Sequence, residues 1–382
     1  MQPDCQTLVT ERIRQSGPIT VADYMELALY APGAGYYARA AQRSGRAGDF
    51  VTSVDVSPLY GELLAVRFAE LWRSSQQTTP GVISPSHAER NHSGSGFQLV
   101  ESGAGNGRLS RDVLDAAARR DRQFYDAVSV CLVERSATAR DAHAATLGPH
   151  AAKLTWSSAD LPAAITGILF ANELLDAFPV HVVEMANDGL GEVYVDVNGA
   201  ALTTRVGRPS STRLQQYFDD LGISLHRGVR VEVNLAAIDW IHEAASRLAG
   251  GFAVLIDYGR EARALYEGPH ASGTLTTFHR QMADLPDASG SGAPAWLSEP
   301  GTRDLTTHVD FTTLRREAAR AGLSVSPPVS QSRYLLDLVE RSGLLQDLAR
   351  DDRLRDRLAL KTLLVPGGLG SSHSVIELAR KR

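Results

Sequence analysis

The sequence predicts an α/β fold: a doubly wound, mostly parallel sheet with an N-terminal helical cap and inserted hairpin and helical segments. From Phe97 onward, apolar runs of strand length alternate with amphipathic helical stretches, which is typical of parallel sheets covered on both faces. A glycine-rich turn follows the first of these runs. The chain of 382 residues can bury a large core without disulfide bonds or a structural metal.

The composition is that of an ordinary soluble globular protein. Hydrophobic residues make up 43% and charged residues 22%, and the net charge is −5, which argues against a nucleic-acid-binding surface. No apolar run reaches the ~18 residues of a membrane span. Cys5 and Cys131 are the two cysteines, too few for a disulfide framework or a zinc site, so we expect a cytoplasmic protein without a metal.

An N-terminal helical cap is expected over residues 1–75. Its first helix covers residues 19–30, because Thr20–Asp23 has the spacing of a capping box. A second, amphipathic helix is expected from about residue 57 to 72. Residues 76–96 are rich in Ser, Thr, Pro and Gly, which predicts a flexible loop.

The core is expected over residues 97–382, with insertions at about 180–250 and 260–307. An Asn-Gly dipeptide at 198–199, between alternating strands, predicts a hairpin in the first insertion. Buried strands are predicted at the apolar runs Phe97–Glu101, Val128–Val133, Lys153–Trp156, Gly167–Ala171 and Gly251–Tyr258.

The glycine turn lies in residues 99–108, Leu-Val-Glu-Ser-Gly-Ala-Gly-Asn-Gly-Arg. Glycines after a strand let the backbone approach a ligand, and the next helix offers free amides at its N-terminus. The spacing Gly103-x-Gly105-x-Gly107 puts Arg108 where a dinucleotide-binding fold has its third glycine, which disfavours a nicotinamide or flavin site. No Lys-Ser or Lys-Thr pair follows, so the turn is not a phosphate-binding P-loop.

The pattern acid-x-Gly-x-Gly-x-Gly at residues 101–107 resembles instead the first motif of the class I S-adenosylmethionine (SAM) methyltransferases. A carboxylate at Glu101 suits a cationic cofactor. Glu134, which ends the second strand, can accept from both ribose hydroxyls, and Asp160, past the third strand, can accept from the adenine amino group. Ligands of open α/β sheets bind at these carboxyl ends. Alternatively, Glu134 and Asp160 are only solvated strand ends.

A second motif makes the resemblance more specific. Residues 171–181, Ala-Asn-Glu-Leu-Leu-Asp-Ala-Phe-Pro-Val-His, resemble the Asn-Glu-(Phe/Leu)-x-Asp-Ala-x-Pro-Val-His signature of the MidA family, which includes a mitochondrial complex I assembly factor that methylates protein arginine. Val54-Asp55 departs from the Pro-Glu of the family. Other blocks that resemble the family are Gly35–Tyr37, Gly48–Ser53, Tyr60–Glu62, Leu255–Gly259, Gly273–Leu275 and Asp304–Phe311.

The resemblance implies a class I methyltransferase Rossmann-like fold. It also implies SAM as cofactor and methyl transfer to a protein side chain, such as an arginine of a respiratory NADH dehydrogenase (complex I) subunit. The residues expected to bind the cofactor are Glu101, Gly103, Gly105, Gly107, Glu134, Asp160, Asn172, Asp49 and Thr52.

Candidate catalytic residues follow from the same motifs. Carboxylates can hold a guanidinium bidentately, and Glu173 and Asp176 come after the fourth strand, where the methyl group should lie. Asn172 would orient the substrate or the methionine tail. The alternative is that Glu173 caps a helix and Asp176 lies at the surface. His308 is a candidate general base with Asp310 as its orienter, although a lone histidine is more often structural.

Two functions remain open at this stage. The first is a SAM-dependent protein methyltransferase acting on a partner protein, with a homodimer also considered. The second is a SAM-binding assembly or scaffold protein without turnover. An NAD-dependent oxidoreductase would require NADH to bind more strongly than SAM.

Overall fold

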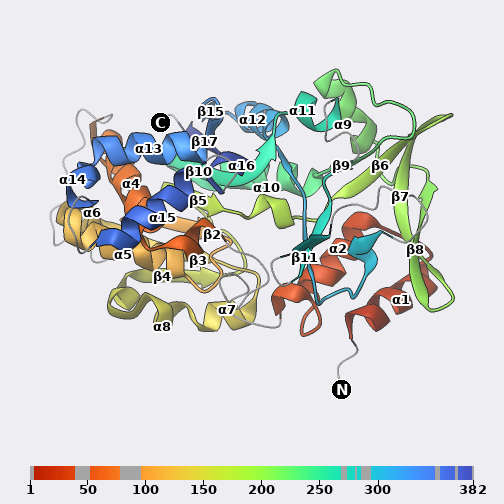
Figure 1. Cartoon of the computed structure of the whole chain (residues 1–382), viewed down its shortest axis with the longest axis horizontal. Helices are drawn as coiled ribbons and strands as arrows, with labels where there is room; N and C mark the ends of the chain where they lie inside the picture. Colours follow the sequence, from red (N-terminus) through yellow and green to blue (C-terminus); the bar gives the residue numbers. More distant parts are fainter. Residues whose placement is uncertain are drawn as a thin grey trace. The chain divides into compact units, whose positions relative to one another are not determined.

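The computed structural model describes residues 4–38, 52–77, 96–267, 273–279, 282–284, 294–348, 353–365 and 369–380 (Figure 1). Contacts divide the chain into two compact units. The sheet unit comprises Thr52–Glu173, His242–Asp257 and Ala318–Arg382, and the meander unit comprises Met1–Val51, Leu174–Ile241 and Tyr258–Glu317.

The sheet unit contains the predicted parallel sheet, with strand order β15-β17-β10-β5-β2-β3-β4. The pairs from β10 to β4 are all parallel, and short β16 pairs antiparallel with β17. Because β2 lies between β3 and β5, the winding direction changes at β2, where open α/β sheets bind ligands. The bounds are β2 Phe97–Ser102, β3 Val128–Val133, β4 Leu154–Ser158, β5 Ile165–Asn172, β10 Leu248–Arg260, β15 Ser324–Val325, β16 Val329–Ser330 and β17 His373–Arg380.

Helices of the sheet unit pack on this sheet and on one another, and Figure 1 shows α4, α13 and α15 grouped together. Phe68 of α4 stacks at a tilt on Phe170 of β5, with ring centroids 5.0 Å apart. Gly61 lets α4 approach α5 closely, because a Cβ there would lie 2.7 Å from the Cβ of Asp112. The bounds are α3 Ser53–Val56, α4 Leu59–Gln77, α5 Arg108–Arg120, α6 Arg122–Ala127, α7 Ala137–Asp141, α8 His143–Leu147, α13 Gln331–Arg341, α14 Leu344–Leu348, α15 Leu354–Leu364 and α16 Leu369–Ser372.

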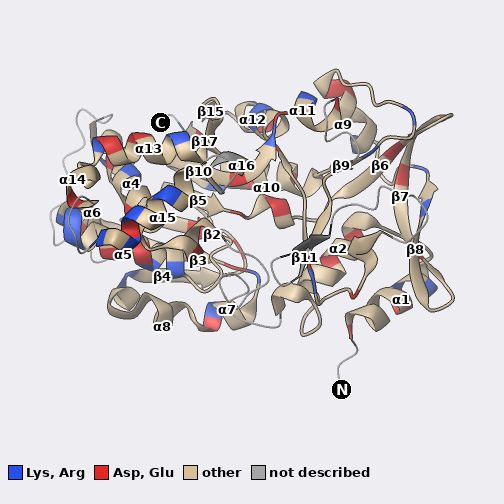
Figure 2. Ribbon diagram, in the orientation of Figure 1, with Lys and Arg blue, Asp and Glu red and all other residues tan. Residues whose placement is uncertain are grey.

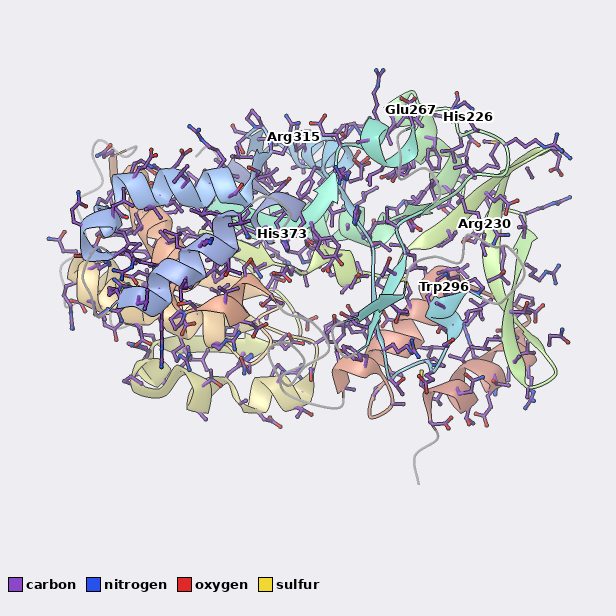
Figure 3. All side chains as sticks on the ribbon, in the orientation of Figure 1. His226, Arg230, Glu267, Trp296, Arg315 and His373 are labelled. Carbon is purple, nitrogen blue, oxygen red and sulfur yellow. The ribbon has the colours of Figure 1, made fainter. Side chains whose placement is uncertain are left out.

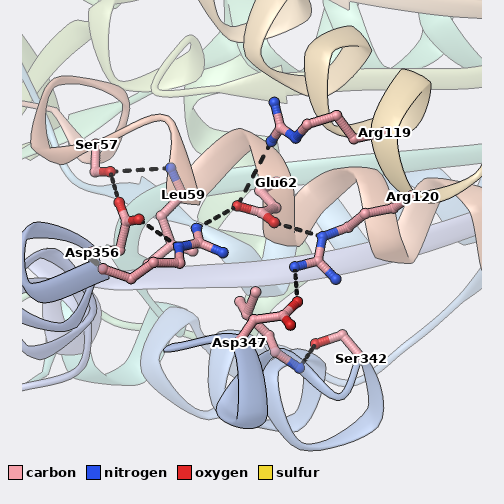
Figure 4. A network of polar contacts seen from close by, with 10 residues as sticks. Ser57, Leu59, Glu62, Arg119, Arg120, Ser342, Asp347 and Asp356 are labelled. Atoms are coloured by element: carbon pink, nitrogen blue, oxygen red, sulfur yellow. Dashed lines mark hydrogen bonds and ion pairs between the residues drawn. The ribbon is translucent and has the colours of Figure 1, made fainter. Parts of the chain in front are cut away.

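Acidic and basic residues both occur on α4, α5 and α15 (Figure 2). The buried Glu62 of α4 accepts from Arg120 Nε at 2.5 Å and from Arg353 Nη2 at 3.0 Å. Arg120 Nη2 also donates to Asp347 Oδ2 at 2.6 Å, and Arg353 Nε donates to Asp356 Oδ2 at 2.7 Å (Figure 4). This network ties the C-terminal helices to α4 and α5.

The meander unit has an antiparallel sheet in the order β1-β7-β6-β9, with β8 on β7, and a second sheet in the order β12-β11-β13. The hairpin expected at the Asn-Gly dipeptide is present, with Asn198 opposite Ala201. The bounds are β1 Ile19–Thr20, β6 His181–Ala186, β7 Gly189–Asn198, β8 Ala201–Gly207, β9 Arg230–Val233, β11 Thr276–His279, β12 Met282–Asp284, β13 Asp304–Thr306 and β14 Val309–Asp310, which pairs with the end of β10.

The helices entirely within the meander unit are α1 Cys5–Ser16, α2 Val21–Tyr30, α9 Arg213–Leu221 and α11 Ala262–Tyr266, and α10 Leu235–Arg247 and α12 Phe311–Arg320 each cross a unit boundary. The predicted capping box of α2 is confirmed, because Asp23 N donates to Thr20 Oγ1 at 3.0 Å and Thr20 N to Asp23 Oδ2. The sequence analysis missed α1, which is capped by Asp4. Short 3₁₀ turns lie at Tyr36–Ala38, Gly148–Lys153, Leu175–Ala177 and Ala295–Leu297.

The units differ from the expected cap and core. Residues 52–75 belong to the sheet unit because α4 packs on the sheet, and most of the expected insertions at 180–250 and 260–307 belong to the meander unit. The expected flexible loop lies outside the described residues except for its ends. Within the described part of the chain, no helix is both long and apolar enough to cross a membrane.

Candidate functional site

The glycine loop, residues 103–107, lies at the carboxyl end of β2. Its backbone is tied to the end of β3, because Gly103 N and Ala104 N donate to the Val133 carbonyl at 2.9 and 3.1 Å. Gly105 has a φ of +53°, which disfavours residues with a side chain. A Cβ on Gly105 would meet nothing within 4 Å, so the backbone here faces open space in which a ligand can lie.

Glu134 is held against this loop. Its Oε2 accepts from Gly105 N at 2.9 Å and its Oε1 from Ser136 N at 2.8 Å. Burial raises the pKa of this carboxyl despite these hydrogen bonds. The backbone of Arg135 also contributes a hydrogen bond to this carboxyl, so of its four or so acceptor positions about one remains for a hydroxyl of a ribose. Glu134 is therefore part of the loop structure and not a solvated strand end.

Asp160 fits the solvated interpretation better. Its side chain is exposed, and its carbonyl accepts from the indole N–H of Trp156 at 3.0 Å. Among the described residues, no group of three or more His, Cys, Asp and Glu side chains is arranged to hold a metal ion.

Glu101 is the penultimate residue of β2 and is buried. Its Oε2 accepts from Ser110 Oγ at 2.5 Å and from Ser110 N at 3.2 Å, in the first turn of α5. Burial, with a contribution from Glu134, raises the pKa of Glu101 to about 8. Within the described part of the chain, no hydrogen bond ends on its Oε1, which leaves an acceptor for a cationic ligand.

The end of β5 carries Asn172 and Glu173. Glu173 N donates to the Ile256 carbonyl at 2.8 Å, which extends the pairing of β5 with β10. Glu173 has a φ of +51°, a conformation that costs energy for a residue with a side chain and is concentrated at functional sites. The backbone at Glu173 is therefore strained, and in this conformation its carboxylate lies at the carboxyl end of β5.

One oxygen of Glu173 is held by its neighbours. Oε1 accepts from Ser53 N at 3.3 Å and from Asn172 Nδ2 at 3.3 Å, and His373 Nε2 lies 3.5 Å away (His373 is labelled in Figure 3). No hydrogen bond or ion pair between described residues ends on Oε2. The contact with Ser53, the first residue of α3, means that Glu173 also contributes to capping that short helix.

A buried polar group supports Asn172. The hydroxyl of Tyr60, on α4, donates to Asn172 Oδ1 at 2.6 Å and also lies 3.2 Å from Gln331 Oε1. Gln331 Nε2 donates to Ser53 Oγ at 2.9 Å. Because Oδ1 is engaged by Tyr60, the amide of Asn172 directs its Nδ2 toward Glu173. Sequence reasoning missed Tyr60, Gln331 and His373, although Tyr60 lies in a block that resembles the family.

Thr52 acts here as a helix cap, because its N and Oγ1 bond to Asp55 Oδ2 at 2.9 and 3.0 Å. Asp55 also pairs with Arg108 Nη2 at 2.5 Å, so the arginine that replaces a third glycine ties α5 to α3. The expected contact of Thr52 with a cofactor stays a prediction. Asp49 lies outside the described residues.

The remaining candidates belong to the meander unit. Asp176 is buried there and not at the surface. His308 packs edge-on against Tyr258, with centroids 5.5 Å apart, and its backbone N donates to Thr274 Oγ1. The expectation that Asp310 orients His308 is wrong, because Asp310 caps α12 and accepts from Tyr217 at 2.6 Å.

A family of S-adenosyl-L-methionine-dependent methyltransferases, Methyltransf_28, matches residues 63–329. The chain belongs to this family. It is 30% identical to the mitochondrial protein arginine methyltransferase NDUFAF7 of Rattus norvegicus over 91% of this chain and 77% of the relative. It is 28% identical to the homologue of Caenorhabditis elegans over 95% of this chain and 83% of the relative.

Solved structures agree with this Methyltransf_28 assignment. A crystal structure of a superfamily member from Burkholderia thailandensis, bound to S-adenosyl-homocysteine (SAH), has a TM-score of 0.83 and 28% identity, covering 98% of this chain and 92% of that one. A second structure from the same organism has a TM-score of 0.80 and 26% identity, covering 98% of this chain and 91% of that one. The predictions of a methyltransferase fold, a SAM-dependent methyltransferase activity and SAM as cofactor are confirmed.

The prediction of a cytoplasmic location is contradicted, because the NDUFAF7 relatives are mitochondrial. That prediction relied on cysteine use. A low cysteine count indicates only that disulfide bonds are not needed, and it does not distinguish one reducing compartment from another.

Proposed function

We propose that this methyltransferase transfers a methyl group from SAM to an arginine of a partner protein. The observation that carries the proposal is the carboxylate of Glu173, which is fixed at Oε1 and unengaged at Oε2 among the described residues, at the carboxyl end of β5. The names of the relatives, protein arginine methyltransferases, support arginine as the acceptor.

The residues fit the chemistry of this transfer. When bound, SAM supplies a methyl group that its sulfonium activates for in-line displacement. A guanidinium nitrogen forms the new N–C bond, the C–S bond breaks toward sulfur to leave SAH, and one N–H proton passes to solvent. Arginine stays protonated at neutral pH, so a preorganised carboxylate such as Glu173 both binds it and stabilises the positive charge that remains.

The proposal also concerns which partner protein is methylated. The resemblance of the sequence to the MidA family links it to complex I assembly, and from this we propose a subunit of respiratory NADH dehydrogenase as the substrate. A homodimer is proposed with it, and light scattering would then give twice the 41.1 kDa of the chain.

The experiment is methyl transfer from labelled SAM to proteins in an extract of cells that lack this gene, followed by mass spectrometry of the labelled protein. Methylarginine in a complex I subunit supports the proposal. Label on another side chain contradicts arginine as the acceptor. If SAM binds in calorimetry and no protein is labelled, the chain is a SAM-binding scaffold instead.

Glu173→Gln tests the carboxylate itself. Gln keeps an oxygen for Ser53 and Asn172 but removes the charge, so we expect SAM affinity within twofold of wild type and single-turnover methyl transfer lower by ~100-fold. A capping role alone would instead lower stability by ~0.5–2 kcal/mol with turnover intact. Glu299→Gln is the matched control, because Glu299 also has a positive φ, +49°, but lies exposed and pairs with Arg303.

A further inference from the structure

His143, which the site described above does not include, lies beneath the glycine loop. It is the first residue of α8, and 1% of its surface is exposed. Its Nε2 is 2.9 Å from the carbonyl oxygen of Gly105, and its Nδ1 is 2.9 Å from Ser157 Oγ. All three residues belong to the sheet unit.

The tautomer of His143 follows from its partners. A carbonyl oxygen only accepts, so Nε2 carries the proton and donates to Gly105. In the neutral ring Nδ1 is then the acceptor and takes the hydroxyl proton of Ser157 at the end of β4. Burial lowers the pKa of His143, which favours this neutral ring.

Together with Glu134, His143 holds the Gly105 residue from both sides. The N–H of Gly105 donates to Glu134, and its carbonyl accepts from His143. In a trans peptide the carbonyl and the following N–H point in opposite directions, so the bond to His143 also sets the direction of the Asn106 N–H. Without these two hydrogen bonds, the peptide groups of Gly105 could take up other orientations, because glycine is flexible and the space beside it is open.

We propose that His143 is a positioning residue for the cofactor: its Nε2–H holds the Gly105 carbonyl and so preorganises the glycine loop for SAM. Ser157 acts through His143 by fixing the tautomer and the ring orientation. The inference deepens the proposed function at its cofactor site, and it depends on SAM binding alone and not on arginine as the acceptor.

Two isosteric substitutions separate the two hydrogen bonds. The amide nitrogen of glutamine reaches the position of Nε2, so His143→Gln keeps a donor for Gly105. Asparagine is shorter and reaches only the position of Nδ1, so His143→Asn keeps a partner for Ser157 and loses the bond to Gly105. We expect SAH affinity, measured by calorimetry, within ~3-fold of wild type for His143→Gln and lower by ~10-fold for His143→Asn.

His150 provides the matched control. It is buried in the same unit and also makes two hydrogen bonds, to Tyr125 Oη and to Asp115 Oδ1, both at 2.9 Å. Neither partner belongs to the glycine loop. His150→Asn should lower the melting temperature about as much as His143→Asn and leave SAH affinity within twofold of wild type.

Equal SAH affinities for His143→Gln and His143→Asn would overturn the proposal, and so would an equal loss in His150→Asn. If His143→Asn does not fold, Ser157→Ala decides in its place, because it leaves the imidazole present but no longer oriented. Weaker SAH binding by Ser157→Ala supports the positioning role, and unchanged binding refutes it. Because methyl transfer is not measured, a failure here is distinguishable from a failure of the arginine assignment.

Discussion

Two buried glutamates, one in each unit, differ in how many of their carboxylate oxygens accept hydrogen bonds. In the meander unit, both oxygens of Glu192 are engaged, Oε1 by His181 at 2.7 Å and Oε2 by Ser210 N at 2.5 Å. In the sheet unit, the hydrogen bonds that Glu101 receives from described residues both come from Ser110 and end on Oε2.

The pKa values move in opposite directions for this reason. Burial alone would raise the pKa of Glu192, but the hydrogen bonds from His181 and Ser210 outweigh it and lower the pKa. At Glu101 burial prevails, and the pKa rises to about 8. Hydrogen bonds within the chain stabilise the charged form of Glu192, whereas burial disfavours the charged form of Glu101.

Glu173 shows the same asymmetry, with three neighbours at Oε1 and none among the described residues at Oε2. Asp310, like Glu192, has both oxygens engaged. A buried carboxylate that the chain leaves half satisfied is costly, and a ligand can remove that cost. From this comparison we propose that Glu101 and Glu173 face a ligand, whereas Glu192 and Asp310 are structural.

The largest expected effect tests the conformation of the loop. Gly105→Val places a β-branched residue at a φ of +53° and fills the space beside the loop, so we expect SAM affinity to fall by more than ~100-fold in calorimetry. Gly199→Val is the control in the meander unit, because Gly199 has a φ of +65° and equally open surroundings. It should lose stability and keep its SAM affinity, and equal affinity losses would contradict a specific role for Gly105.

The next effect concerns Glu134. Glu134→Ala removes the acceptor of Gly105 N and the proposed partner of the ribose, and we expect SAM binding ~10- to 100-fold weaker. Glu184→Ala is a control, because Glu184 pairs with Arg230 in the meander unit. An affinity within twofold of wild type would remove Glu134 from the cofactor site.

A smaller effect is expected from the support of Asn172. Tyr60→Phe removes the donor to Asn172 Oδ1, and we expect turnover lower by ~10-fold with about 1 kcal/mol of lost stability. Tyr334→Phe is the control, since Tyr334 is half-buried in the same unit and its hydroxyl donates to Glu377 at 2.8 Å. It should lose similar stability with wild-type turnover. Equal turnover in the two variants would mean that Tyr60 only stabilises the fold.

The smallest effect is expected on stability in the absence of cofactor, and it sharpens the comparison of the two glutamates. Because the folded pKa of Glu101 is about 8 against 4.5 unfolded, the folded state binds an extra proton between these values, and its stability falls as pH rises through them. Glu101→Gln cannot ionise, so its melting temperature relative to wild type should rise from pH 5 to pH 9. The folded pKa of Glu192 is lowered, so that carboxylate stabilises the fold above its unfolded pKa and less as pH falls.

Calorimetric melting at several pH values checks both directions. Glu192→Gln should be most destabilising near neutral pH and less so in acid, opposite to the trend of Glu101→Gln. A pH-independent difference for either variant would contradict the assigned protonation state.

The sequence by itself determined the parallel sheet, the glycine loop, the capping box of α2 and the methyltransferase family. These features depend on neighbouring residues. The apolar run Val128–Val133 is a strand in the structure with the same bounds, and Gly103, Gly105 and Gly107 each have a positive φ in the predicted turn. Local spacing is enough because strand and turn conformations depend on a few consecutive residues.

Only the tertiary structure decided which side chains meet. Tyr60 and Asn172 are 112 positions apart, and Tyr60 and Gln331 are 271 apart, so no spacing in the sequence relates them. For the same reason Asp310, two positions from His308, was wrongly expected to orient it, while the fold directs its carboxylate to Tyr217, 93 positions away. Hydrogen-bond partners are set by which strand ends and helices pack together, and that packing involves the whole chain.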